Sequence, residues 1–184
     1  MYGAKLLAAA TTVAAILSNA QFALAAATLT RDAYDAALDR VSVVYKDMSA
    51  KCGAMSGHEK DMCAAQAKAV EMRAKAAADA NYQDTNKAKT DSRIADADAD
   101  FMVAKVACDA KGGHDRIICV KQAEATQIKL VADAKAHKTS VDAQANARED
   151  TRDAEYQLAL AKCNAMSSPE KRTCLTAANS TYGK

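Results

Sequence analysis

Several residue types are nearly missing from this 184-residue chain: tryptophan is absent, proline occurs once, and aromatic residues make up 4% of the sequence. So few aromatic residues leave little with which to line a small-molecule pocket. The sequence also lacks a Gly-rich phosphate loop, a nucleophile elbow and a C-x-x-C redox motif. These absences predict that the protein is not an enzyme.

Charge of one sign is not in excess either. The chain has 25 Lys and Arg residues against 23 Asp and Glu residues, and the two signs are interleaved as on a solvated helical surface. No basic block or basic-aromatic run occurs, so we expect no nucleic-acid partner. No stretch after residue 25 is apolar enough to span a bilayer, which predicts no transmembrane segment once the N-terminus is removed.

The N-terminus has the features of a secretory signal peptide. Residues 1–25 contain one charged residue, Lys5, followed by an apolar run from Leu6 to Leu17. The segment ends with Ala23-Leu24-Ala25, which places small residues at the two positions that signal peptidase reads. We expect cleavage after Ala25, and a mature protein of residues 26–184 that is periplasmic or secreted.

The six cysteines reveal an internal repeat. They form three pairs whose partners are eleven positions apart, and the first cysteines of the pairs are 56 and then 55 positions apart. An even number of cysteines in an exported chain indicates disulfides. Six cysteines allow about fifteen pairings. The repeat favours the one that joins each cysteine to its neighbour in the pair: Cys52 to Cys63, Cys108 to Cys119, and Cys163 to Cys174.

This spacing predicts helical hairpins. In one straight helix, cysteines eleven residues apart would be about 16 Å apart, whereas the Cα atoms of a disulfide lie within about 7 Å. The chain must therefore reverse between them, near 53–58, 110–114 and 165–169. Ser56 with Glu59, and Ser167 with Glu170, fit capping boxes. The turn and capping residues are Ser56, Gly57, Gly112, Gly113, Ser167 and Pro169.

The resulting prediction is one all-α domain over 26–184, built from antiparallel helical hairpins in three repeats of about 55 residues, each closed by a C-x10-C disulfide. Alanine is a quarter of the chain, and each alanine buries one methyl group, so the core is weak. Each disulfide adds about 3 kcal/mol by the chain-entropy estimate. An aromatic residue two helical turns before each first cysteine predicts core packing on the cysteine face: Tyr45, Phe101 and Tyr156.

Between the turns the chain contains neither glycine nor proline, from Glu59 to Ala110 and from His114 to Ser168. Both stretches are rich in strong helix formers. The weakest helical segments lie near 81–92 and 138–146, close to the two midpoints. The composition favours two long continuous helices, kinked at these segments. The alternative is a break at both, which would give three consecutive hairpins of similar length.

Two sets of turn residues could bind a metal ion instead of forming disulfides. Cys52, His58 and Cys63 could supply soft ligands, as could Cys108, His114 and Cys119, but the third repeat has Pro169 where the histidine should be. The cysteines are therefore interpreted as disulfides, and no metal or cofactor is expected.

A run of three acids, Asp96, Asp98 and Asp100, resembles the start of a calcium-binding EF-hand loop. Phe101 and Ala107 stand where that loop needs Gly and Glu, so a solvated helix face is the better interpretation.

Alanine-rich stretches carry a family resemblance. Ala64-Ala65-Gln66-Ala67-Lys68-Ala69, Ala95-Asp96-Ala97-Asp98-Ala99-Asp100 and Ala161-Lys162-Cys163 resemble small exported Ala/Lys/Asp-rich helical repeat proteins of Gram-negative bacteria. Those proteins are similar in composition to the periplasmic stalk of the Tol system. The resemblance implies a periplasmic location and a helical structural class, and it implies no functional residues.

Taken as a sequence, the chain is expected to be an exported, non-enzymatic structural or interaction protein of the cell envelope, with a protein or envelope component as its partner. One alternative is a periplasmic holdase-type chaperone or stress protein, which would need an exposed apolar groove. Flexible methionines suit such a groove, and the candidates are Met48, Met55, Met62, Met72 and Met102. The second alternative is a metal-binding protein that uses the turn cysteines and histidines.

Overall fold

The computed structural model describes residues 28–184, and in that range the chain forms helices and no strands. The helices are α1 (Arg31–Gly53), α2 (Gly57–Gln83), α3 (Asn86–Cys108), α4 (Gly113–Asn164) and α5 (Ser168–Tyr182). Each helix packs against the next one along the chain. The predicted all-α class of antiparallel hairpins in three repeats is confirmed. The predicted signal peptide lies outside the described residues.

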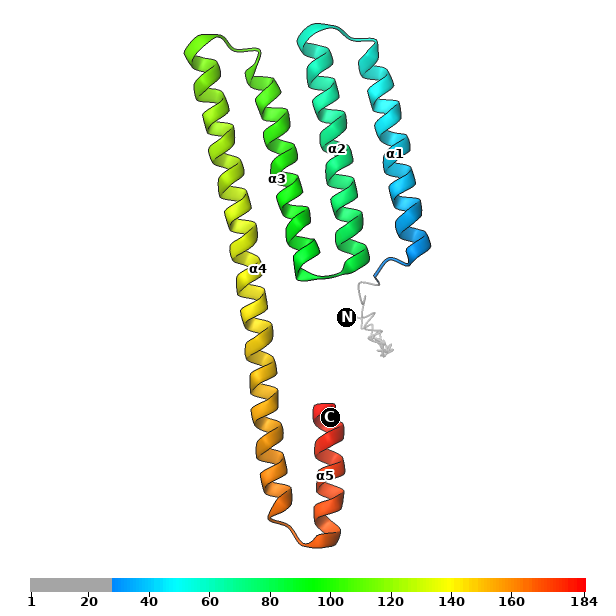
Figure 1. The fold of residues 1–184 in the computed structure, drawn as a ribbon, viewed down its shortest axis with the longest axis vertical. Helices are drawn as coiled ribbons and strands as arrows, with labels where there is room; N and C mark the ends of the chain where they lie inside the picture. The colour runs from blue at the N-terminus through cyan, green and yellow to red at the C-terminus, as the bar shows by residue number, and fades with distance from the viewer. Residues whose placement is uncertain (1–27) are drawn as a thin grey trace, which may run out of the picture.

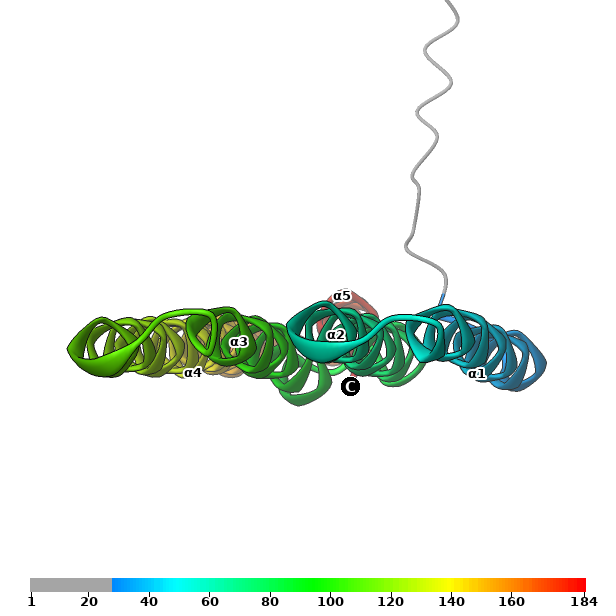
Figure 2. The same cartoon turned by 90° about the horizontal axis from the view of Figure 1, so that it is seen from above.

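The helices lie side by side in a single layer (Figures 1 and 2). α2 and α3 occupy the middle, so each has a neighbouring helix on two opposite sides. Seen from above, residues 28–184 form no second layer over either broad face (Figure 2). The buried residues of the described chain are accordingly almost all alanine and cysteine.

This architecture explains the alternation of alanine and aspartate in α3. Two residues along a helix differ by about 200° in direction, so every second residue falls on opposite sides of the helix. Ala97 and Ala99 are 2% and 0% exposed because they face the two neighbouring helices. Alternation of this kind is usually a strand pattern. Here it marks a helix buried along two opposite edges.

The same alternation occurs in α2. Ala65, Ala67, Ala69 and Glu71 are buried, while the residues between them are exposed. The single-layer arrangement explains the alternation in both central helices, because each of them has a neighbouring helix on two opposite sides.

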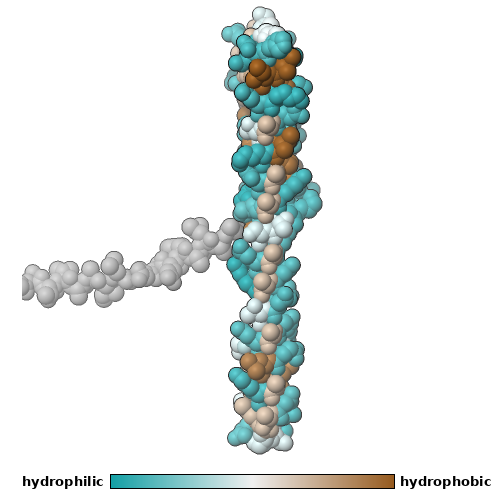
Figure 3. All heavy atoms as spheres, turned by 90° about the vertical axis from the view of Figure 1, so that its left-hand side faces the viewer, coloured by the Kyte–Doolittle hydropathy of each residue, from teal (hydrophilic) through white to brown (hydrophobic). Residues whose placement is uncertain are grey.

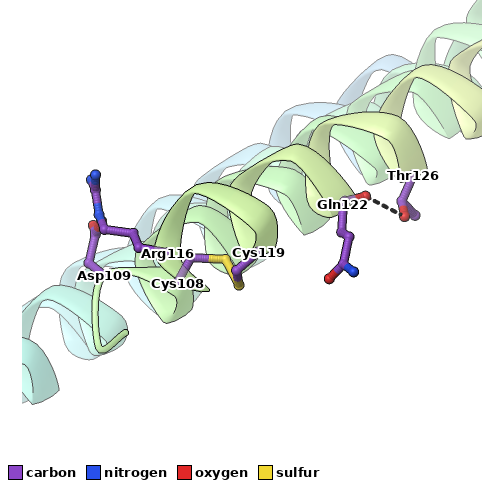
Figure 4. Close-up of a disulfide and its surroundings, with 6 residues drawn as sticks. All are labelled: Cys108, Asp109, Arg116, Cys119, Gln122 and Thr126. Carbon is purple, nitrogen blue, oxygen red and sulfur yellow. Dashed lines mark hydrogen bonds and ion pairs between the residues drawn. A yellow bond between two sulfur atoms is a disulfide. The ribbon is translucent and has the colours of Figure 1, made fainter. Parts of the chain in front are cut away.

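All three disulfides join the predicted partners. The Cα–Cα distances are 5.4 Å for Cys52–Cys63, 5.7 Å for Cys108–Cys119 and 5.5 Å for Cys163–Cys174. Each bond lies beside a helix reversal, as Figure 4 shows for Cys108 and Cys119. The first two reversals are at one end of the molecule and the third is at the opposite end (Figure 1).

Glycine and proline take the expected places in these turns. Gly57 and Gly113 begin their helices with φ of +55° and +50°, a left-handed conformation that glycine adopts without steric cost. Pro169 lies in the first turn of α5. In the turn between α3 and α4, Arg116 Nη2 is 2.7 Å from the carboxylate of Asp109, and this ion pair closes the loop beside the disulfide.

The predicted capping boxes are wrong. Ser56 and Ser167 are the N-cap residues of α2 and α5, but neither side chain accepts a capping hydrogen bond from the backbone. The hydroxyl of Ser167 instead donates to the Glu170 carboxylate at 2.5 Å. The side-chain caps are made by two threonines: Thr30 accepts from the Ala33 amide at 3.2 Å, and Thr85 accepts from the Ala88 amide at 3.1 Å.

The first of the two expected long helices is also wrong, because the chain reverses between α2 and α3. Asp84 ends α2 in the left-handed region with φ of 47°, and Thr85 caps α3. Aspartate is one of the few non-glycine residues that adopt this conformation readily. The weak segment predicted near 81–92 is therefore a full turn rather than a kink.

The second expected long helix is present as α4, which has 52 residues and is about 78 Å long. The weak segment near 138–146 stays helical, and neighbouring residues form hydrogen bonds and an ion pair with its polar side chains. Lys138 forms an ion pair with Asp142, and Asn86 of α3 donates to the same carboxylate at 2.9 Å. Thr139 lies 55 positions after Asp84. Its β-branched side chain makes a left-handed turn costly there, and its hydroxyl instead donates to the Lys135 carbonyl at 3.1 Å.

Candidate interaction surface

A groove of about 440 Å³ lies between α3 and α4 on one broad face of the layer. Five charged or titratable side chains line it together with Ala97, Leu130 and Ala134: Arg93, Asp96, Asp100, Asp133 and His137. Three of these side chains come from α3 and two from α4, so the antiparallel packing of the two helices creates the site.

The acids of this groove are paired within the protein. Arg73 of α2 forms an ion pair with Asp100, and its Nε atom is 3.9 Å from Asp96. Lys129 neutralises Asp133 at 2.6 Å. The predicted acidic face therefore takes part in cross-helix ion pairing as well as solvation. Among residues 28–184, no three His, Cys, Asp or Glu side chains are placed to hold one metal ion.

The opposite broad face carries a second open groove, of about 480 Å³, between the same helices. Asp98 belongs to this face, where it accepts a hydrogen bond from Gln127 at 2.7 Å. The lining of this groove includes the large apolar residues Ile94, Ile128 and Val131, and Ile128 is 62% exposed. Both grooves are open to solvent, which suits contact with a macromolecular surface better than enclosure of a small substrate.

The turn residues do not form a metal site in this oxidised protein. Every cysteine of the described chain is in a disulfide, and a disulfide sulfur is not the thiolate that metal ions bind. His58 and His114 are exposed in the first turns of α2 and α4. They lie beside their disulfides as ordinary surface residues.

The three predicted core aromatics are half-buried, each against the partner helix of its own hairpin. Lys68 of α2 lies 5.6 Å from the centre of the Tyr45 ring. Phe101 lines a small groove between α3 and α4. Tyr156 donates to Asn179 of α5 at 2.8 Å. The prediction of a shared face with the cysteines holds, but a layer one helix thick leaves each ring partly in solvent.

The methionines do not gather in one exposed groove. Met48, Met62, Met72 and Met102 are half-buried. Met55 is 43% exposed in the first turn. Met166 was not in the set proposed from the sequence. It is 46% exposed in the turn between α4 and α5, which lies at the opposite end of the molecule (Figure 1).

Sequence reasoning missed an aromatic cluster that ties α1 to the end of α2. The rings of Tyr34 and Tyr82 stack with centroids 4.6 Å apart, and the Tyr34 hydroxyl donates to Asp79 at 2.5 Å. This hydrogen bond raises the pKa of Tyr34 above its usual value. The two tyrosines are 48 positions apart, and no motif in the sequence links them.

A buried carboxylate was also missed. Glu71 is buried in α2 between Lys68 and Lys75, whose ammonium groups are 2.7 and 2.6 Å from it. Hydrogen bonds from Lys68 and then Lys75 hold the pKa of Glu71 below its usual value. Its charge is thus balanced inside its own helix.

The three disulfides indicate an oxidising, extracytoplasmic environment. Across residues 28–184, none of the helices combines the length and the apolarity needed to cross a membrane. Comparisons with protein-family models, with curated proteins and with solved structures found no match to this chain.

Proposed function

We propose that this protein is a non-enzymatic structural or interaction protein of the cell envelope that acts as a rigid spacer between partners at its two ends. One observation carries the proposal. The layer has an axial helix about 78 Å long, and both ends of that helix are cross-linked to a neighbouring helix by a disulfide. Each disulfide keeps a neighbouring helix attached beside one end of α4, so the two ends are reinforced and α4 itself spans the distance between them.

The proposal includes export through the signal peptide of residues 1–25 and a periplasmic or secreted location. The disulfides support this address, because they form and persist in oxidising compartments. The grooves between α3 and α4 support an interaction role because they are open to solvent and carry exposed apolar and charged side chains. The partner is a protein or another envelope component.

Site-specific photo-crosslinking tests the spacer role in cells. The exposed residues Met55 and Met166 lie in turns at opposite ends of the molecule, so a photoreactive amino acid at either position samples one end. Arg148, exposed in the middle of α4, is the matched control.

We expect envelope components to be cross-linked from both ends and not from position 148. Small-angle scattering of the oxidised protein should also show an elongated particle. A compact particle, or the absence of adducts from both ends, would refute the spacer role.

A further inference from the structure

Among residues 28–184, no helix packs on the outer edge of α4. α3 and α5 both pack on the same side of α4, where Ala134 and Cys163 are buried. The opposite side is left uncovered by the described part of the chain along the whole helix. In Figure 3 this edge faces the viewer as a pale apolar line with darker hydrophobic groups. Two of the large residues on it, Ile118 and Leu158, are 54% and 56% exposed.

This edge corresponds, through the internal repeat, to an interface that the chain already forms. The first half of α4 is the repeat equivalent of α2, and the second half is the equivalent of α3. Ala80, Ala88 and Ala99 are buried where α2 and α3 are in contact. Their equivalents, 56, 55 and 55 positions later, are Ala136, Ala143 and Ala154, and all three are exposed.

Large apolar residues are likewise less exposed in α2 and α3 than at the equivalent positions of α4. Met62 and Val103 are half-buried in α2 and α3. The equivalent residues in α4 are Ile118 and Leu158, which are more than half exposed. The two halves of α4 therefore carry the residues of an α2–α3 interface, but they cannot face each other because α4 does not turn where α2 and α3 do.

The charges are also preserved. Arg73 of α2 pairs with Asp100 of α3 across that interface. Their repeat equivalents are Lys129 and Glu155, which have the same signs and lie in different halves of one straight helix. The Lys129 side chain is 73% exposed and forms an ion pair with Asp133 of its own helix.

The edge is symmetric about the point between Thr139 and Ser140. Ala136 and Ala143 lie equally far from that point, as do Ala132 and Ala147, and Ala125 and Ala154. In a pair of antiparallel α4 helices related by a two-fold axis at that point, alanine would face alanine at all three levels. Lys129 of each copy would lie against the second half of α4 of the other copy, the half that contains Glu155. This self-complementarity is what a two-fold interface requires.

We propose that two copies of this chain associate antiparallel through the outer edge of α4, about a two-fold axis between Thr139 and Ser140. The second copy supplies to each half of α4 the neighbour that α2 and α3 supply to each other. The dimer forms one continuous layer and reproduces the α2–α3 interface twice. This inference is independent of the spacer role, because it concerns self-association and not the partners at the ends.

Sedimentation of the oxidised protein over a concentration series tests the proposal. We expect a mass of two chains for the unaltered protein. Ala136→Glu places a bulky charge on the interface and should weaken association about tenfold or more. Ala145→Glu is the matched control, because Ala145 is exposed on the opposite side of the same helix, and it should dimerise normally. A single-chain mass at every concentration up to about 1 mM would overturn the proposal.

Cross-linking tests the register. The double variant Ala136→Cys/Ala143→Cys puts two thiols about 10 Å apart on one helix, too far to join within it. In the proposed dimer each faces the other position of the second copy, so we expect a covalent dimer under mild oxidation. Ala125→Cys/Ala132→Cys has the same spacing and exposure without the mirror relation, and it should cross-link far less. Equal cross-linking of both variants, or a bond within one chain, would overturn the proposal, because an internal bond requires α4 to break and fold back.

Discussion

Asn86 donates its side-chain amide to the Asp142 carboxylate at 2.9 Å, which ties the first residue of α3 to the middle of α4. The contact lies next to the place where the repeat would otherwise turn. It joins residues 56 positions apart and links α3 to the segment of α4 that stays helical there. The same carboxylate receives Lys138 from its own helix.

The titration of Asp142 provides the first prediction. Hydrogen bonds from Lys138 and then from Asn86 lower its pKa below the usual 3.8. A group whose pKa is lowered in the folded state stabilises the fold at neutral pH and loses this contribution as the pH falls through the lowered value. Lys138→Met should raise the pKa of Asp142 most, and Asn86→Ala should raise it less, as measured by NMR titration of the carboxyl carbon. An unchanged pKa in both variants would contradict these contacts.

The continuity of α4 provides the second prediction. Ser140 lies in the helix interior, where proline removes a backbone hydrogen bond and clashes with the preceding turn. Ser140→Pro should therefore lower the free energy of unfolding by about 3 kcal/mol, measured by urea titration. Ser140→Ala is the control and should be neutral or slightly stabilising. Equal stability of the two variants would mean that α4 is already interrupted there.

The turn between α3 and α4 contains two adjacent glycines that can be compared directly. Gly113 has φ of +50°, whereas its neighbour Gly112, the N-cap of α4, has φ of −105°. An added Cβ would meet no atom within 4 Å at either position, so steric contacts do not distinguish them. Gly113→Ala should cost about 1–2 kcal/mol because of its left-handed backbone, while Gly112→Ala should cost only about 0.5 kcal/mol, because alanine fits that backbone and is merely a poorer N-cap than glycine. Thermal unfolding of both variants measures the difference.

The contact between α2 and α3 provides a packing prediction. Ala99 is 0% exposed, so the larger side chain in Ala99→Leu would push the helices apart. We expect a loss of about 1–3 kcal/mol of stability. Ala107→Leu makes the same substitution at an exposed position of α3 and should change stability little. If both variants were equally stable, the two central helices would not be in close contact.

The disulfides provide the last prediction. Replacing Cys108 and Cys119 together by serine removes a cross-link that closes a short loop, and it should cost about 3 kcal/mol. The comparison is made by urea unfolding under oxidising conditions, where the other two bonds remain. Under reducing conditions the double variant and the unaltered protein should become nearly equal in stability. A difference that persisted after reduction would show that the serines act in another way.

The hairpins were predictable because a disulfide limits the distance between its two Cα atoms. Cysteines eleven residues apart on a helical chain can meet that limit only where the chain reverses. The choice between a turn and a continuous helix was not. The segments near Asp84 and Thr139 have similar local composition, and their outcomes differ because Asp84 accepts a left-handed conformation while Asp142 is held by a distant residue. Local propensity contains no information on the second effect.

The candidate surface was predicted less well. Asp96, Asp98 and Asp100 were identified as a solvated face, yet they divide between the two broad faces and contact α2 or α4. The alternation of alanine with these acids was visible in the sequence. Its meaning depends on having a helix on each side, and the sequence did not indicate that the helices form one layer.

The position of the disulfides determines how the molecule would respond to mechanical load. Cys108–Cys119 and Cys163–Cys174 close the helix pairs at the two ends of α4. Under tension between those ends, α3 and α5 cannot separate from α4 beginning at the turns, because a disulfide joins each helix pair there. The load passes along α4 itself, and the two disulfides keep a neighbouring helix in place beside each loaded end, so oxidation should protect the ends of this thin protein from local unfolding.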